Sequence, residues 1–159
     1  MSKAISIIMG SQSDLEIVCE TIKLLKEFKA GFEVRVLSAH RTPKELAAYV
    51  ELASRKGTKV FIAAAGGAAA LAGVVAAHTT LPVIGIPIET SALKGIDSLL
   101  STVQMPAGVP VASMAIGKAG AKNAALFALE ILGITDKKIS SALKRYRLEA
   151  AVKIKAIKL

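Results

Sequence analysis

Short apolar runs alternate with amphipathic segments along this chain of 159 residues. Five runs rich in Ile, Val and Ala predict strands. They span residues 4–9, 32–37, 60–64, 83–87 and 109–116. Between them, apolar residues recur every three or four positions, which is typical of a helix that buries one face. The predicted helices span residues 15–28, 43–56, 71–78, 97–103 and 118–132, and a terminal one follows a cap at Thr135 or Asp136.

This alternation predicts an α/β fold. Strands that are buried on both faces appear as continuous apolar runs, and right-handed crossovers place helices on both sides of the sheet. We expect a single catalytic domain over residues 1–159, built as a three-layer α/β/α sandwich around five parallel strands in the order 2-1-3-4-5. The loops after strands one, two and three then converge on one crevice at the switch point.

The loop at residues 38–43, Ser-Ala-His-Arg-Thr-Pro, carries the strongest chemical signal. It joins the second strand to a helix, with Thr42 expected as the N-cap and Pro43 at the first helical position. Capping does not explain His40 or Arg41. Arginine is a permanent cation whose fork fits phosphate or carboxylate, and histidine exchanges protons near neutral pH. The loop therefore predicts an anion-binding group beside a proton-transfer group.

Two further loops are rich in small residues. Residues 10–14, Gly-Ser-Gln-Ser-Asp, lead from the first strand to a helix N-terminus, where free amides favour an anion. Asp14 would repel a phosphate and suits sugar hydroxyls better, although Ser13 or Asp14 could equally be a plain helix cap. Residues 65–70, Ala-Gly-Gly-Ala-Ala-Ala, have almost no side chains, so any ligand contact there must come from the backbone.

Composition suggests contact with other subunits. Hydrophobic residues make up 53% of the chain, without tryptophan, which is high for a small monomer. The net charge is +9, and eight lysines and arginines lie in the last 23 residues, on an amphipathic helix over residues 136–159. The positive charge alone would suit a nucleic-acid partner, but aromatic residues are only 4%, too few for base-stacking platforms. We expect this helix to pack on another subunit, with no nucleic-acid partner.

Several other classes of function are disfavoured. Two histidines, one cysteine and no clustered carboxylates argue against a metal site. The dinucleotide pattern GxGxxG, the phosphate loop GxxxxGK[ST] and the nucleophile elbow GxSxG do not occur. No uninterrupted apolar run reaches the ~18 residues of a membrane span, since the richest stretch, residues 60–77, is broken by glycines. A single cysteine and the lack of a signal-like N-terminal segment fit a cytoplasmic protein without a membrane partner.

Three motifs in order resemble a known family. They are Gly-Ser-x-Ser-Asp at 10–14, Ser-Ala-His-Arg-Thr-Pro at 38–43 and Ala-Gly-Gly-Ala-Ala at 65–69, and further matches follow at 81–85, 95–99, 104–111, 115–120 and 123–125. Together they resemble the N5-carboxyaminoimidazole ribonucleotide mutases, the catalytic subunit family of phosphoribosylaminoimidazole carboxylase in purine biosynthesis. The resemblance covers roughly residues 3–132. It implies a flavodoxin-like fold, a homo-octamer, and neither a metal nor an organic cofactor.

The resemblance also implies residue roles. His40 matches the family's essential histidine, which handles the proton of the imidazole ring. Ser11, Asp14 and Arg41 match positions that bind the ribonucleotide, with Ser13 and Ser38 beside them. The turn Gly66-Gly67-Ala68 would form a tight, dry pocket for carbon dioxide, and Leu71 completes the candidate set.

The chain departs from the family after the third strand. Ala70 and Ala72 stand where the family has histidine and proline, and His78, two helical turns later, is not expected to replace that histidine. A direct carboxylase that acts on aminoimidazole ribonucleotide and carbon dioxide, a lyase rather than an isomerase, therefore stays open as an alternative. A non-catalytic nucleotide-binding module is a second alternative, which the presence of Asp14, His40 and Arg41 disfavours.

Overall fold

The computed structural model describes residues 3–158, so the predicted domain limits at residues 1 and 159 lie outside the described residues. Five strands are present: β1 (Ile5–Met9), β2 (Phe32–Val36), β3 (Val60–Gly66), β4 (Val83–Ile88) and β5 (Ala112–Ser113). The helices are α1 (Leu15–Glu27), α2 (Pro43–Arg55), α3 (Leu71–Ala77), α4 (Ile96–Val103), α5 (Gly117–Gly133) and α6 (Lys137–Lys155). A short 3₁₀ helix, η1 (Gln12–Asp14), precedes α1.

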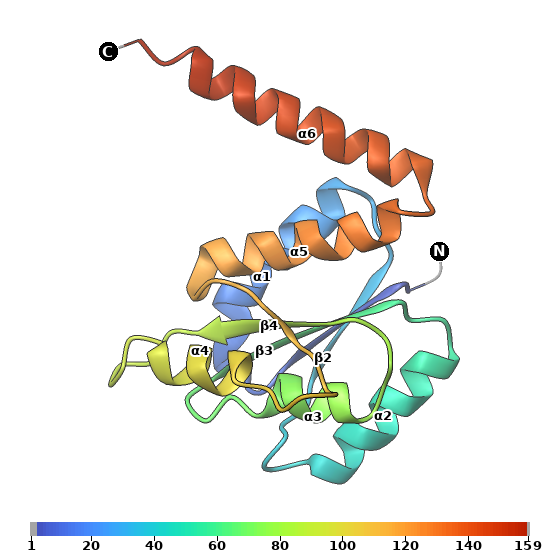
Figure 1. Cartoon of the computed structure of the whole chain (residues 1–159), viewed down its shortest axis with the longest axis vertical. Helices are drawn as coiled ribbons and strands as arrows, with labels where there is room; N and C mark the ends of the chain where they lie inside the picture. The colour runs from blue at the N-terminus through green and yellow to red at the C-terminus, as the bar shows by residue number, and fades with distance from the viewer. Residues whose placement is uncertain (1–2, 159) are drawn as a thin grey trace.

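The strands form one parallel sheet in the order β2-β1-β3-β4-β5, which confirms the predicted topology. Figure 1 shows the sheet between two groups of helices. The reversal of strand order falls between β1 and β3. The loops that leave the carboxyl ends of these two strands therefore diverge and leave a crevice between them.

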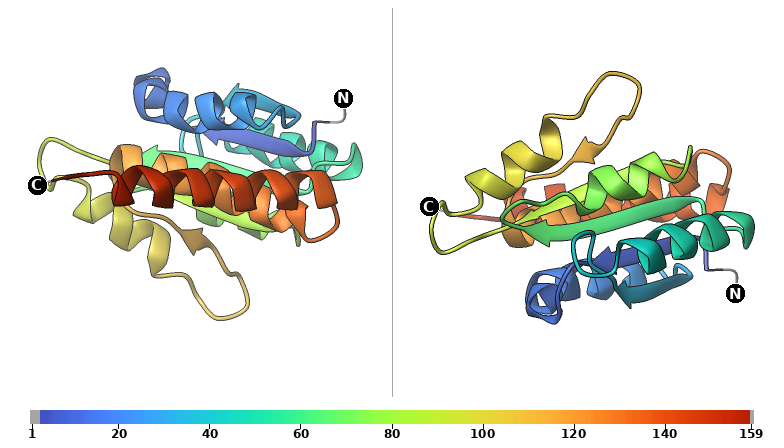
Figure 2. Two further views of the ribbon diagram at one scale, coloured as in Figure 1. Left: turned by 90° about the horizontal axis from the view of Figure 1, so that it is seen from above. Right: turned by 90° about the horizontal axis from the view of Figure 1, so that it is seen from below.

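Each central strand packs against both helical layers because neighbouring side chains point to opposite faces. On β1, Ile5, Ile7 and Met9 join the core under α1 and α5, whereas Ile8 joins the core under α2 and α3. The helices α1 and α5 lie on one side of the sheet and α2, α3 and α4 on the other (Figures 1 and 2). This arrangement confirms the predicted three-layer sandwich.

The fifth strand is much shorter than expected. An eight-residue strand was predicted over residues 109–116, but only Ala112 and Ser113 pair with β4, followed by one hydrogen bond from the Met114 amide to the Gly85 carbonyl (2.9 Å). Pro110 has no amide hydrogen, so it cannot extend the ladder. The run is an edge strand with one neighbour, and apolar character alone overestimated its length.

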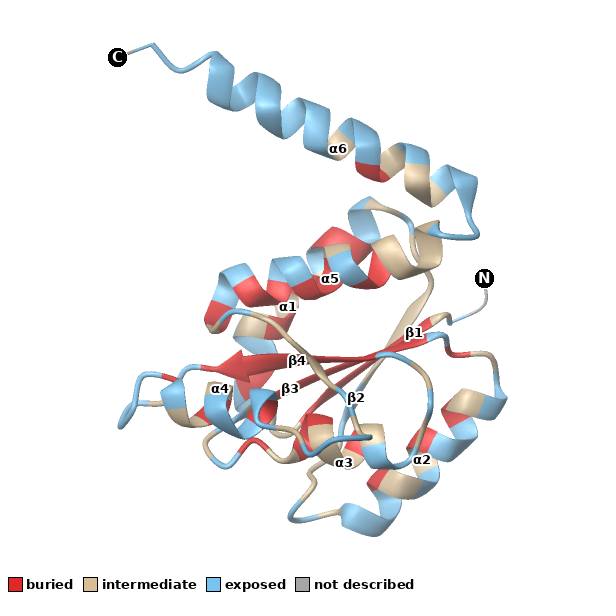
Figure 3. Ribbon diagram, in the orientation of Figure 1, coloured by how far each residue is buried: buried red, intermediate tan, exposed pale blue. Residues whose placement is uncertain are grey.

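The terminal helix α6 leaves the body of the protein. Asp136 caps it by accepting hydrogen bonds from the amides of Lys138 (2.8 Å) and Ile139 (3.3 Å), which confirms one of the two predicted caps. Leu143 packs into the core cluster beside α5, but the second half of the helix is largely exposed (Figure 3). Four large apolar residues in this half and just beyond the end of the helix are 57–70% exposed: Leu148, Val152, Ile154 and Ile157.

Candidate active site

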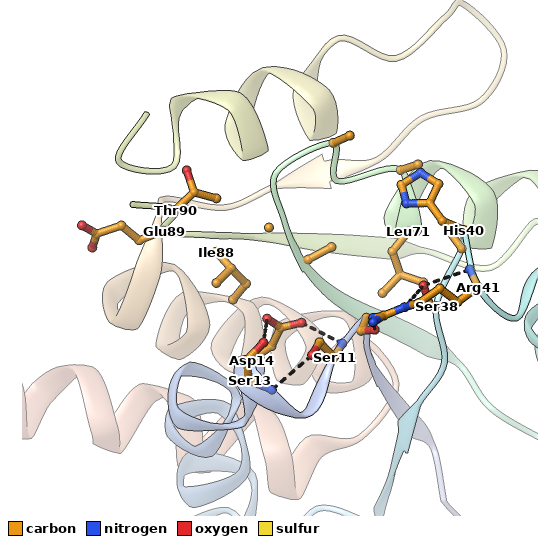
Figure 4. A pocket seen from close by; sticks show the side chains of 16 residues that line it. Ser11, Ser13, Asp14, Ser38, His40, Arg41, Leu71, Ile88, Glu89 and Thr90 are labelled. Atoms are coloured by element: carbon orange, nitrogen blue, oxygen red, sulfur yellow. Dashed lines mark hydrogen bonds between the residues drawn. The ribbon is translucent and has the colours of Figure 1, made fainter. Parts of the chain in front are cut away.

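A cavity of about 370 Å³ lies at the carboxyl ends of the strands, at the predicted crevice. Figure 4 shows that its lining comes from the loops after β1, β2, β3 and β4. These loops contribute the following residues: Gly10, Ser11, Ser13, Asp14, Ser38, Ala39, His40, Arg41, Ala65, Gly66, Ala68, Ala70, Leu71, Ile88, Glu89 and Thr90. The cavity therefore contains every predicted site residue except Gly67.

The loop after β1 is held by a reciprocal pair of hydrogen bonds. Ser11 caps η1 by accepting from the amide of Ser13 (3.3 Å), and the Ser11 amide donates to Asp14 Oδ2 (3.0 Å). This is a capping box, with an acidic residue at the third position. The alternative of a plain helix cap by Ser13 or Asp14 holds only in position. Asp14 occupies the N-cap of α1 but makes no side-chain cap, and Ser13 donates its hydroxyl to Asp14 Oδ1 (3.3 Å).

Asp14 is the buried carboxylate of the site. It is 6% exposed, and burial raises its pKa above the ordinary value. Hydrogen bonds from Ser11, Ser13 and Gly10 and the positive charge of Arg41 oppose that shift without cancelling it. A partly desolvated carboxylate at the cavity wall accepts hydrogen bonds strongly from a neutral donor such as a sugar hydroxyl.

Arg41 joins the first two loops. Its Nη2 donates to the Gly10 carbonyl (2.7 Å) and its Nε to Ser38 Oγ (3.3 Å), while its backbone amide also donates to Ser38 Oγ (3.2 Å). The guanidinium is thus fixed at the cavity wall, and its remaining N–H groups are available to an anion. Such a group can recognise a phosphate with little loss of side-chain entropy.

Thr42 occupies the N-cap position of α2 but does not cap it with its side chain, contrary to the prediction. Its hydroxyl accepts from the Ser38 amide (2.9 Å) and donates to the Ser38 carbonyl (3.1 Å). These two bonds close the five-residue turn, Ser38 to Thr42, that presents His40 and Arg41. Thr42 therefore shapes the site, while Pro43 begins the helix as expected.

His40 lies on the exposed side of the cavity and is its only imidazole. Figure 4 shows its ring at the cavity with no hydrogen bond to the other side chains drawn. The ring nitrogens are therefore accessible to a bound molecule. The second histidine, His78, lies at the opposite end of α3, where its Nδ1 is 3.7 Å from Glu51 Oε1. It does not line this cavity, as predicted.

The end of β3 and the turn after it contribute Gly66, Ala68, Ala70 and Leu71 to the cavity lining, which does not include Gly67. The Gly67 amide donates to Ser98 Oγ (2.9 Å), so it is engaged within the protein. Its φ of 69° lies in the left-handed region, which explains the glycine. Ala70, where the sequence resemblance led us to expect a histidine, also lines the cavity.

The end of β4 and the segment after it line the cavity although the sequence did not mark them as site residues. Ile88, Glu89 and Thr90 line the cavity, and Glu89 adds a second carboxylate to it. The only sequence signal was the long polar, irregular segment that starts at Glu89, which is a common sign of a functional loop. That signal did not identify which residues of the segment face the crevice.

Residues 3–158 contain no group of three or more His, Cys, Asp or Glu side chains placed to hold a metal ion. None of the helices in the described range has the length and apolar character needed to cross a membrane.

Comparisons with known proteins identify the family of the chain. The AIR carboxylase family matches residues 4–153. An N5-carboxyaminoimidazole ribonucleotide mutase of Pyrococcus abyssi is 55% identical over 90% of this chain and 81% of its own length, and one of Bacillus subtilis is 52% identical over 92% and 91%. A crystal structure of Treponema denticola PurE superposes with a TM-score of 0.86 at 30% identity, covering 94% of this chain and 92% of that one. Since the family matches almost the whole chain, the protein belongs to the AIR carboxylase family.

Proposed function

We propose that the protein is a mutase that converts N5-carboxyaminoimidazole ribonucleotide to 4-carboxy-5-aminoimidazole ribonucleotide in purine biosynthesis. One observation carries the proposal: a single cavity brings together an accessible imidazole, a fixed guanidinium and a buried carboxylate. These are the groups needed to move a proton, hold a phosphate and bind a ribose. Relatives above 50% identity that bear the mutase name support the same conclusion.

The reaction needs no external oxidant, reductant or group donor. The bond between the exocyclic nitrogen and its carboxylate breaks, the nitrogen gains a proton, and carbon dioxide is released beside aminoimidazole ribonucleotide. The ring carbon then forms a bond to that carbon dioxide and loses its own proton. One proton is taken up and one is given back, so His40 can serve both steps as acid and base.

Substrate recognition follows from the loops. We assign the phosphate to Arg41, together with the hydroxyls of Ser11, Ser13 and Ser38, and the ribose hydroxyls to Asp14. The small residues Gly66 and Ala68, with Leu71, form the wall beside the reacting carboxyl group. Confinement matters here, because a carbon dioxide molecule that stays beside the ring reacts at a high effective concentration.

Ala70 is the observation that favours a second candidate, direct carboxylation of aminoimidazole ribonucleotide by carbon dioxide. Ala70 lines the cavity at the position where the sequence resemblance led us to expect a histidine, so an imidazole expected there is absent. The test is a two-substrate assay on the purified protein. We expect turnover of the carboxyamino substrate without bicarbonate, and little turnover of aminoimidazole ribonucleotide with bicarbonate. The reverse result would make the protein a carboxylase, and binding without turnover of either would make it a nucleotide-binding module.

We also propose that the protein is a cytoplasmic homo-oligomer, with an octamer as the specific expectation. Two apolar surfaces support this assembly. The first is the exposed part of α6, and the second runs along α4 and the segment before it, where four residues are 48–58% exposed: Leu93, Ile96, Leu100 and Val103. A closed symmetric assembly would bury both. Light scattering at physiological salt should give about eight times the 16.5 kDa chain mass, whereas an active monomer would contradict the proposal.

A further inference from the structure

A buried serine connects two walls of the active-site cavity. Ser98, on α4, is completely buried, and its hydroxyl makes two hydrogen bonds outside its own helix. It accepts from the Gly67 amide (2.9 Å) and donates to the Ile88 carbonyl (2.7 Å). Gly67 belongs to the turn after β3 and Ile88 ends β4, so one hydroxyl links the two segments.

The Ser98 link lies directly beyond the end of the β3–β4 pairing. The pairing of β3 with β4 ends at Gly66 opposite Ile88, and beyond that point the two backbones separate. The Ser98 hydroxyl bridges the next amide of one strand to the last carbonyl of the other, in place of a further rung of the ladder. The side chain of Ser98 therefore connects the two segments of the cavity wall directly beyond the last pair of the sheet.

Neighbouring residues of α4 reinforce the same wall. Thr90 Oγ1 donates to both carboxylate oxygens of Asp97 (2.9 and 3.0 Å), and Ser101 Oγ lies 3.4 Å from the Gly67 carbonyl. Gly66 packs closely on the β4 end, since a Cβ there would meet Ile88 Cβ and Thr90 Cγ2 at 3.5 Å. The first turns of α4 thus hold both segments that border the space beside Ala68.

We propose that Ser98 is a positioning residue that keeps the turn after β3 closed against the end of β4 and so retains carbon dioxide during the mutase reaction. The inference rests on the proposed function. Ser98 touches no substrate, and it acts through the backbone of Gly67 and Ile88. Without its hydroxyl, the Ile88 carbonyl loses its partner in a buried location and the Gly67 amide in a partly buried one. An unpaired polar group of this kind costs free energy unless water reaches it, so the loss favours opening of the turn toward solvent.

The test measures how much carbon dioxide exchanges with solvent in each turnover. The carboxyamino substrate is converted in buffer that contains ¹³C-bicarbonate and carbonic anhydrase, and ¹³C in the product carboxyl group is measured by mass spectrometry. We expect little label with the unaltered protein and at least fivefold more label per product with Ser98→Ala, together with a roughly tenfold lower kcat and a KM changed less than threefold. Ser98→Thr, which keeps a hydroxyl, should return the label toward the unaltered level.

Thr102→Val is the matched control. Thr102 is also buried on α4, but its hydroxyl donates only within the helix, to the Ser98 carbonyl (2.7 Å). It should leave the label unchanged, so equal labelling in Thr102→Val and Ser98→Ala would overturn the inference. Amide hydrogen exchange of Gly67 gives a readout without substrate, and exchange as slow in Ser98→Ala as in the unaltered protein would also overturn it. Failure of the unaltered protein to isomerise the substrate would instead reject the proposed function.

Discussion

Replacement of Arg41 by alanine tests the assignment of the phosphate site. Two of the five N–H groups of its guanidinium are bonded within the protein, to Gly10 and Ser38, which leaves three for a ligand. A phosphate that accepts two of these makes charge-assisted bonds of roughly 1.5–3 kcal/mol each. The sum, about 3–6 kcal/mol, corresponds to a loss of roughly 10²–10⁴-fold in affinity. We expect the lower end of this range, because Arg41 is exposed and solvent screens its charge.

The same substitution also releases two loops from each other. The bonds to Gly10 and Ser38 contribute on the order of 1 kcal/mol each, so loop loosening should weaken any ligand by roughly 10-fold to 30-fold. This part of the loss is independent of phosphate. Calorimetric titration with 4-carboxy-5-aminoimidazole ribonucleotide and with its dephosphorylated nucleoside separates the two effects. Arg41→Ala should weaken the nucleotide at least several-fold more than the nucleoside.

Arg55→Ala is the matched control for charge. Arg55 is an exposed arginine in the last turn of α2, at the opposite end of the helix from the cavity, so its loss removes one positive charge without touching the site. Nucleotide affinity should change less than twofold in this variant at physiological salt. Equal losses for nucleotide and nucleoside in Arg41→Ala would refute the phosphate assignment and leave Arg41 with a purely structural role.

Three further outcomes are expected. His40→Asn should abolish turnover in a spectrophotometric assay while nucleotide affinity stays within a few-fold, and near-normal turnover would remove the imidazole from the mechanism. Because burial raises the pKa of Asp14, its ionisation costs stability as pH rises through that pKa. In urea unfolding between pH 4 and 7, Asp14→Asn should therefore gain stability relative to the unaltered protein as pH rises, while its activity falls. A stability deficit of the variant that widens with pH would contradict this. Gly120→Ala should lower the free energy of unfolding by about 3 kcal/mol or more, since its Cβ would lie 1.6 Å from the Ala115 carbonyl oxygen, whereas Gly73→Ala meets only the flexible Met105 side chain at 3.2 Å and should change it by less than ~1 kcal/mol.

The sequence determined most of the fold because its signals are local and repeated. Buried parallel strands leave continuous apolar runs, helices leave three-to-four spacing, and right-handed crossovers restrict the order in which such elements can pair. The same logic located the site, because loops after parallel strands meet at one edge of the sheet. Ser11, Asp14, His40 and Arg41 line one cavity although up to 30 residues separate them along the chain.

Tertiary structure decided the features that depend on a pairing strand or a hydrogen-bond partner rather than on the sequence pattern. The apolar run at 109–116 resembles a full strand, but its length was set by pairing with β4 at an edge and by the missing amide of Pro110. Likewise, Thr42 has the residue type and position of a cap, yet its hydroxyl bonds to Ser38 because the turn brings that backbone within reach.

The wall of the cavity shows the same limit most clearly. Gly67 lies in a turn whose small residues suggest ligand binding, but its amide donates a hydrogen bond to Ser98, 31 residues away. Glu89 and Thr90 belong to no recognisable motif. They line the cavity because β4 ends beside β3 in the sheet. A hydrogen bond has short reach and strict direction, so its partners follow from the folded backbone and not from residue type. Sequence therefore determined the layers, the strand order and the loops that meet, and only the folded chain decided which groups in those loops remain free for a ligand.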